Sequence, residues 1–167
     1  PGAAEMNIRP ATEADAQALV NIYNPYIKDT LITFEYTEVS AEEFAGRIRK
    51  VLEGGYPYLV AEENDRILGY SYATQFRTRA AYRFTVETTI YLDRSAAGKG
   101  IGTSLYGALL DELRKRKFHL AIGGITLPNP PSQALHEKLG FKQVASFHEV
   151  GYKFDQWVDV GFWELKL

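Results

Sequence analysis

The chain has 167 residues, no cysteine and a formal net charge of -2 at pH 7. This length indicates a single domain that can bury its own core. The missing cysteines exclude a disulfide scaffold, a Cys-ligated metal and a cysteine nucleophile, and they fit a reducing, cytoplasmic location. A general nucleic-acid surface would need excess positive charge, and no apolar run approaches the roughly 18 residues of a membrane span. We therefore expect neither nucleic acid nor membrane as a partner.

The first third of the chain predicts one strand and two helices. Met6 is the only methionine, so we expect residues 1–6 to be an N-terminal extension or cloning remnant and 7–167 to form the domain. A strand is expected at 7–9. A capping box at Thr12 begins a helix that should end at Asn24, because Pro25 disfavours helix in the residue before it. A second helix is expected from Ser40 to Glu53.

The remainder of the chain predicts alternating strands and helices. Alternating and β-branched segments indicate strands at 58–62, 67–75, 84–92, 119–125, 141–150 and 158–167, and apolar stripes indicate helices at 100–117 and 132–139. Strands therefore outnumber helices and do not alternate with them regularly. The pattern predicts an α/β mixture and excludes a doubly wound dehydrogenase fold.

A glycine-rich segment, Ala97-Gly98-Lys99-Gly100-Ile101-Gly102, connects the strand at 84–92 to the long helix. Glycines let the backbone approach a ligand closely, and free N–H groups at a helix start favour an anion. Lys99 adds a positive charge and Thr103 a hydroxyl. The segment is not a dinucleotide fingerprint, since Thr103 takes the third glycine position, nor a P-loop, since Gly100 follows Lys99. It predicts a pyrophosphate site, with a plain flexible turn as the alternative.

The strand at 84–92 carries one carboxylate, Glu87, near its middle. Side chains alternate along a strand, so Thr89 and Tyr91 share the face of Glu87. Burial would raise the pKa of this carboxyl and make it a general base near neutral pH, able to accept a proton from an ammonium group. The alternative is an exposed glutamate paired with a neighbouring cation.

Two arginines, Arg77 and Arg79, precede this strand and would point to one side of an extended chain. A guanidinium group binds a carboxylate or phosphinate through two parallel hydrogen bonds. The pair therefore predicts an anionic group on the substrate. A solvated charge cluster or a subunit contact is the alternative.

The glycine segment resembles the acetyl-CoA loop of the GCN5-related N-acetyltransferase (GNAT) superfamily. Members bind the pyrophosphate of acetyl-CoA with an Arg/Gln-x-x-Gly-x-Gly/Ala loop between a strand and a helix. Gly100 and Gly102 occupy the two glycine positions of that motif, and Ala97 stands where Arg or Gln is expected. The departure removes one side-chain contact and leaves the main-chain amides unaffected.

Three longer strings narrow the resemblance. FRTRAAYRFTVETTIYL, LPNPPSQALHEKLGF and VGYKFDQWVDVGFW occur in an order similar to the phosphinothricin (methionine sulfoximine) N-acetyltransferase family, and the likeness runs from about Asn7 to the C-terminus. It implies an α/β (α+β), single-domain GNAT fold with a mixed, mostly antiparallel sheet flanked by helices. It also implies acetyl-CoA as cosubstrate, no metal, a glutamate-like amino acid as acceptor and a homodimer. It further implies a role in herbicide resistance, which can be incidental to a metabolic role.

The resemblance also implies roles for individual residues. Glu87 would be the general base, with Tyr152 and His136 as further catalytic candidates. The amino-acid site would contain Phe34, Arg77, Arg79, Tyr82 and Thr89. The acetyl-CoA site would contain Ile90, Tyr91, Leu92, Gly98, Lys99, Gly100, Ile101, Gly102, Thr103, Asn129 and Ser132. Packing or capping is the structural alternative for His136, Asn129 and Tyr152.

The resulting hypothesis is direct acetyl transfer to an amine without a covalent enzyme intermediate. Glu87 would take a proton from the ammonium, and the amides of Ile90 to Leu92 would orient the thioester. We expect Glu87 and the loop 98–102 to lie on the same side of the sheet, and the enzymatic hypothesis depends on that placement. The alternatives are transfer to another amine, such as a peptide N-terminus, and a non-catalytic acyl-CoA sensor.

Overall fold

The computed structural model describes residues 6–167, so the expectation for Pro1 to Glu5 lies outside the described part. It contains β1 (Asn7–Pro10), α1 (Ala16–Asp29), α2 (Ala41–Glu53), β2 (Tyr58–Glu63), β3 (Arg66–Gln75), β4 (Thr85–Leu92), α3 (Ile101–Lys115), β5 (Leu120–Leu127), α4 (Pro130–Lys138), β6 (Lys142–Lys153) and β7 (Gln156–Lys166). This order of helices and strands is the predicted one. Within residues 6–167, none of the helices has the length and apolar character to cross a bilayer.

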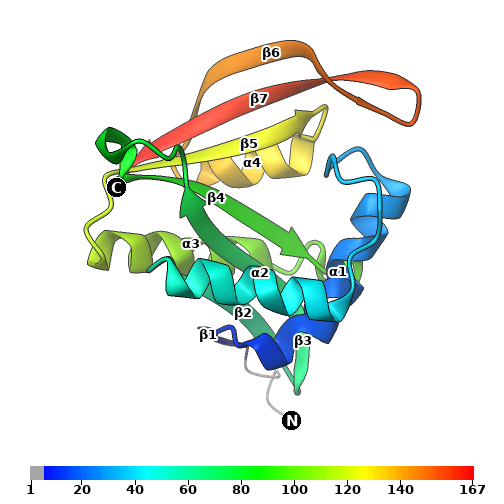
Figure 1. Cartoon of the computed structure of the whole chain (residues 1–167), viewed down its shortest axis with the longest axis vertical. Coiled ribbons are helices and arrows are strands. Elements are labelled where there is room, and N and C mark those ends of the chain that lie inside the picture. Colours follow the sequence, from blue (N-terminus) through cyan, green and yellow to red (C-terminus); the bar gives the residue numbers. More distant parts are fainter. Residues whose placement is uncertain (1–5) are drawn as a thin grey trace.

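The strands form one seven-stranded sheet in the order β1-β2-β3-β4-β5-β7-β6 (Figure 1). Only β4 and β5 are parallel, and the other neighbours are antiparallel. The prediction of a mixed, mostly antiparallel sheet flanked by helices is therefore confirmed.

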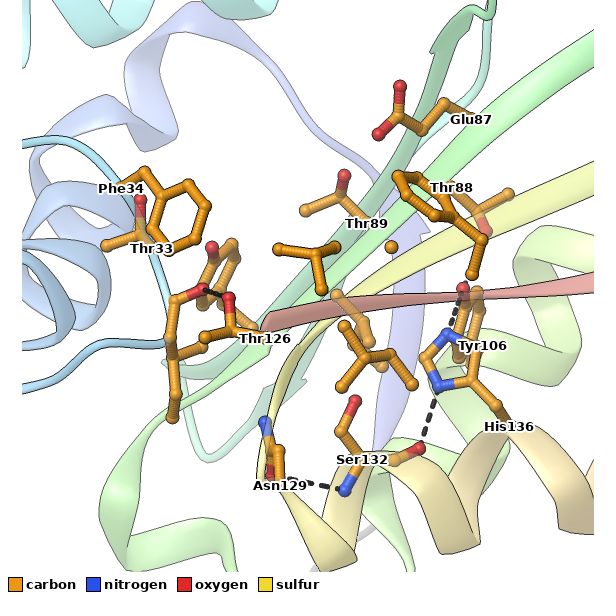
Figure 2. A pocket seen from close by; sticks show the side chains of 17 residues that line it. Thr33, Phe34, Glu87, Thr88, Thr89, Tyr106, Thr126, Asn129, Ser132 and His136 are labelled. Atoms are coloured by element: carbon orange, nitrogen blue, oxygen red, sulfur yellow. Dashed lines mark hydrogen bonds between the residues drawn. The ribbon is translucent and has the colours of Figure 1, made fainter. Parts of the chain in front are cut away.

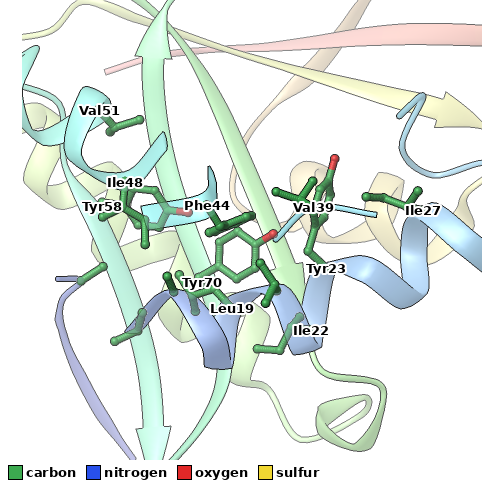
Figure 3. Packing of buried hydrophobic residues seen from close by; sticks show 14 residues of the cluster. Leu19, Ile22, Tyr23, Ile27, Val39, Phe44, Ile48, Val51, Tyr58 and Tyr70 are labelled. Carbon is green, nitrogen blue, oxygen red and sulfur yellow. The ribbon is translucent and has the colours of Figure 1, made fainter. Parts of the chain in front are cut away.

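Helices cover both faces of the sheet. On one face, α1 and α2 pack on β2 and β3 through a cluster that includes Leu19, Phe44, Tyr58 and Tyr70 (Figure 3). On the other face, α3 packs on the central strands through Tyr106, Leu109 and Leu113, against residues such as Val86. The alternation of side chains along each strand supplies apolar residues to both layers.

The first helix is longer than the sequence predicts, because α1 continues through Pro25 to Asp29. Pro25 removes one backbone donor from the helix, but tertiary contacts hold the final turn in place. The Asn24 amide exchanges two 2.9 Å hydrogen bonds with the backbone of Val39, and Ile27 is buried. The predicted end at Asn24 is therefore wrong, since contacts distant in sequence outweigh the local effect of proline.

The parallel pair at the centre of the sheet separates after a short contact. Only Thr85–Glu87 of β4 pair with Leu120–Ile122 of β5, although both strands are eight residues long. Beyond this point β4 and β5 diverge, as Figure 1 shows. Within the described residues, the edge of β4 that faces β5 therefore has no strand partner from Thr88 to Leu92, and the sheet opens there.

Candidate active site

A cavity of about 280 Å³ occupies the opening between β4 and β5 (Figure 2). Its lining comes from the α1–α2 loop, β4, β5, α3, the start of α4, and β7. The lining residues are Ile32, Thr33, Phe34, Glu87, Thr88, Thr89, Ile90, Tyr91, Tyr106, Gly124, Ile125, Thr126, Asn129, Ser132, His136, Val160 and Phe162. Residues from both faces of the sheet therefore meet in one space.

Glu87 lies at one end of this cavity, opposite Asn129 and Ser132 in the view of Figure 2. Its carboxylate makes no hydrogen bond to any group within residues 6–167, and burial raises its pKa above the ordinary carboxyl value. The carboxyl is thus a proton acceptor with no cation to hold it ionised. Glu87 is half-buried and pairs with no cation among residues 6–167, so the alternative of an exposed, ion-paired glutamate does not hold.

Glu87 and the glycine loop lie on opposite faces of the sheet, contrary to our expectation. Tyr91 shares the face of Glu87 and packs on Tyr23 of α1, with ring centroids 5.0 Å apart. The neighbouring residue Thr88 points the other way and lies 2.6 Å from the Tyr106 hydroxyl of α3. Opposite faces would keep the two groups apart only in an unbroken sheet. Because β4 and β5 separate, the cavity connects the two faces, and Glu87 can act on a group that enters from the α3 side.

The glycine loop at the start of α3 has the geometry of an anion site. Gly98 and Gly100 have φ values of +77° and +73°, which residues with a β-carbon rarely adopt, and open space surrounds both. The first backbone bond of the helix runs from Ser104 N to Gly100 O. The N–H groups of Ile101, Gly102 and Thr103 are consequently left without helical partners and can bind a pyrophosphate. Lys99 is exposed beside them.

The proposed acetyl-CoA residues divide between the loop and the cavity. Ile90, Tyr91, Asn129 and Ser132 line the cavity, whereas Leu92 and the loop residues Gly98 to Thr103 lie outside it. Main-chain groups of a strand alternate between its two edges, so the free edge of β4 offers amides toward the opening. Asn129 also caps α4, since its side chain accepts a hydrogen bond from Ser132 N at 3.4 Å.

A buried chain of hydrogen bonds runs along the α3 side of the cavity, from Ser132 through His136 and Tyr106 to Thr88. The Nδ1 atom of His136 lies 2.7 Å from the Ser132 carbonyl oxygen, which can only accept, so Nδ1 carries the proton. Nε2 then accepts from the Tyr106 hydroxyl at 2.9 Å, and Thr88 donates to Tyr106. Burial lowers the pKa of His136 and favours this neutral form.

Gly123 of β5 makes room for this chain. A β-carbon at Gly123 would lie 2.6 Å from His136 Nε2. Tyr106 and Thr88 were absent from the sequence-derived site. Tyr106 lies on the apolar stripe of its helix. The helical spacing of these apolar residues predicts that Tyr106 is buried, but it does not predict a polar partner for its hydroxyl.

The α1–α2 loop contributes Thr33 and Phe34 to the wall of the cavity. Lys153 of β6 is buried beneath this loop, and its ammonium donates to the carbonyl oxygens of Ile27, Thr30 and Thr33, each at 2.8 Å. The Phe34 ring packs directly on Gly151 of the same strand. The loop thus depends on β6 for its position.

Four of the predicted catalytic and substrate-binding residues lie away from the cavity. Arg77, Arg79 and Tyr82 belong to an exposed segment before β4, where Arg77 stacks on the Tyr82 ring at 5.8 Å. Tyr152 is 47% exposed on β6, packs on Trp157 with centroids 4.8 Å apart, and lies 3.3 Å from Asp155 through its hydroxyl. The structure therefore groups Phe34, Thr89 and His136 with Glu87, but not these four.

Comparison with known proteins shows the family of the chain. The family model "Acetyltransferase (GNAT) domain" matches residues 8–161. A phosphinothricin N-acetyltransferase of Streptomyces coelicolor is 39% identical over 100% of this chain and 99% of its own. An L-methionine sulfoximine/L-methionine sulfone acetyltransferase of Salmonella typhimurium is 36% identical over 97% of this chain and 95% of its own.

Solved structures give the same result. A phosphinothricin acetyltransferase from Sinorhizobium meliloti in complex with acetyl-CoA superposes with a TM-score of 0.93 and 37% identity, covering 97% of this chain and 88% of that one. A structure titled ribosomal-protein-alanine N-acetyltransferase from Brucella melitensis superposes with a TM-score of 0.94 and 37% identity, covering 96% of this chain and 99% of that one. The fold and the site thus define an acyltransferase that uses a CoA thioester.

The chain belongs to the GNAT acetyltransferase family, and it is an N-acetyltransferase whose acetyl donor is acetyl-CoA. The glycine loop, the free edge of β4 and Asn129 fit that donor. No group of three or more metal-ligating side chains occurs among residues 6–167.

Proposed function

We propose that the chain acetylates the α-amino group of a small glutamate-like amino acid, such as phosphinothricin or methionine sulfoximine. The observation that supports this most is the placement of the unpaired Glu87 carboxyl at the acceptor end of a cavity that passes between β4 and β5. The relatives at 36–39% identity act on this class of amine. Acetylation of phosphinothricin in the cytoplasm would also protect a cell from that herbicide.

The reaction needs two proton movements. Glu87 takes one proton from the substrate ammonium, and the free amine attacks the thioester carbonyl carbon held along the edge of β4. As the C–S bond breaks, the second amine proton passes to the departing thiolate, and Glu87 returns its own proton to solvent. Tyr106 lines the cavity, so we assign the second transfer to its hydroxyl, which gives its proton to the thiolate and takes up the amine proton, in place of the exposed Tyr152.

We also propose a homodimer formed through the β6–β7 hairpin. β6 is an edge strand in which nine of the twelve residues are exposed. Val150 and Tyr152 of β6 and Trp157 of β7 are 57%, 47% and 65% exposed. A long apolar edge strand promotes association unless something covers it. A second copy would cover it and could bring its own Arg77 and Arg79 toward the acceptor. Light scattering of the wild type and a Trp157→Glu variant tests this, and a monomeric wild type refutes it.

Steady-state kinetics with acetyl-CoA test the substrate assignment. The acceptor panel contains phosphinothricin, methionine sulfoximine, the twenty amino acids and an alanine-initiated peptide, with thiol release as the readout. The proposal predicts that the first two give the highest kcat/KM. The peptide is the second candidate because of the Brucella structure's title, and a peptide preference would overturn the proposal. CoA binding without turnover of any amine would indicate a sensor.

A further inference from the structure

A second, larger cavity lies beside the acceptor end of the active site. It has a volume of about 600 Å³ and lies between α2 and the strands β2 and β3. Six of its thirteen lining residues are aromatic, including Tyr58, Tyr70 and Tyr72, and α2 contributes Val51 and Arg47. Figure 3 shows Val51, Tyr58 and Tyr70 in this layer of the molecule. Neither the glycine loop nor the catalytic groups use it.

The floors of the two cavities are continuous across one strand pair. In the register of β3 with β4, Thr74 lies opposite Glu87 and Tyr72 lies opposite Thr89. Directly opposed residues have β-carbons about 5 Å apart on the same face of the sheet. A side chain attached to an amine held at Glu87 therefore needs to cross only one strand spacing to enter the second cavity.

The second cavity also contains polar atoms without protein partners. Tyr58 and Tyr70 are 2% and 1% exposed, and neither hydroxyl makes a hydrogen bond within residues 6–167. No polar side-chain atom of the described residues is both fully enclosed and unpaired. These two hydroxyls consequently reach the cavity. A ligand that fills the cavity would enclose these hydroxyls, and an enclosed polar group without a partner is costly, so a ligand that can pair with them is favoured over one that cannot.

We propose that this cavity is an acceptor subsite for a polar aromatic ring, which extends the substrates to amino acids whose side chain ends in a phenol or a heteroaromatic ring. The inference rests on the proposed function, because Glu87 has to receive the amine. The flat walls suit a ring: Tyr58 and Tyr72 are stacked with centroids 4.7 Å apart and an interplanar angle of 19°. The two free hydroxyls would bind the polar atom of that ring.

The test compares L-2-amino-4-(4-hydroxyphenyl)butanoate with methionine sulfone as acceptors. Val51→Phe fills the second cavity, and Leu52→Phe is the matched control, because Leu52 is 39% exposed and lines a different surface of α2. We expect Val51→Phe to lower kcat/KM for the phenolic acceptor about tenfold or more and to leave methionine sulfone within about twofold. Leu52→Phe should change neither value.

A second variant covers the case in which Val51→Phe does not fold. Tyr70→Phe removes only the hydroxyl and should reduce the preference for the phenolic acceptor over its phenyl analogue several-fold. The subsite alone is overturned if the enzyme acetylates methionine sulfone but not the phenolic acceptor. It is also overturned if neither variant changes the kcat/KM for the phenolic acceptor. If no amino acid is acetylated, the proposed function fails. Calorimetry of the phenolic amino acid with wild type and with Val51→Phe then tests the subsite. The subsite is refuted if the two proteins bind this amino acid equally or if the wild type does not bind it.

Discussion

Replacing Lys153 with methionine should both destabilise the protein and weaken acceptor binding. The buried ammonium donates three 2.8 Å hydrogen bonds to the carbonyl oxygens of Ile27, Thr30 and Thr33. Lys153→Met keeps an unbranched, flexible side chain that is one atom shorter, and it removes all three donors. Each carbonyl left unpaired costs at least about 1 kcal/mol, so the free energy of unfolding should fall by roughly 3 kcal/mol. Relief of the buried charge, whose desolvation lowers the pKa of Lys153, offsets part of it.

Thermal unfolding and two-substrate kinetics measure the consequences. For a domain of this size, a loss of 3 kcal/mol corresponds to a fall in Tm of roughly 6–12 °C. Because Thr33 and Phe34 lie on the released loop, the KM for the acceptor should rise while the KM for acetyl-CoA stays nearly constant. Lys142→Met, at the exposed start of the same strand, is the control. An unchanged Tm together with an unchanged acceptor KM would refute this role of Lys153.

Three further substitutions test separate parts of the site. Gly151→Ala places a β-carbon against the Phe34 ring and should raise the KM for the acceptor. A variant whose KM values for the acceptor and for acetyl-CoA both equal those of the wild type would contradict this packing. Gly100→Ala forces a side chain at φ +73°, which costs about 1–2 kcal/mol and should raise the KM for acetyl-CoA only. Tyr106→Phe removes the donor to His136 Nε2 and should lower kcat and raise the imidazole pKa, measured by NMR. An unchanged histidine titration would argue against that hydrogen bond.

Local signals in the sequence are enough to predict the order of the elements. The Ser40 cap accepts its hydrogen bond from Glu43 N at 3.1 Å, and the glycine loop precedes α3 as expected. These features depend on residues a few positions apart, so the printed sequence contains their cause. The continuation of α1 through Pro25 depends on Val39 and could not be predicted in this way.

The shape of the site depends on a register that periodicity does not encode. Nothing in the two strand sequences shows that β4 and β5 pair over only three residues before they separate. That separation brings Glu87, from the α1–α2 face, into one cavity with Tyr106 and His136 of the other face. The sequence predicts Glu87 as a candidate because a carboxylate in a buried strand is unusual, whereas Tyr106 has no comparable signal.

The pH–rate profile of Glu87→Gln against wild type, with methionine sulfone and saturating acetyl-CoA, tests the role of Glu87 most directly. Burial raises the pKa of this carboxyl, so wild-type kcat/KM should fall as the pH drops through a value above the ordinary carboxyl range, where the base becomes protonated. The glutamine variant should lose that acid limb and about a hundredfold in kcat. A variant that retains both the limb and the turnover would show that another group accepts the ammonium proton.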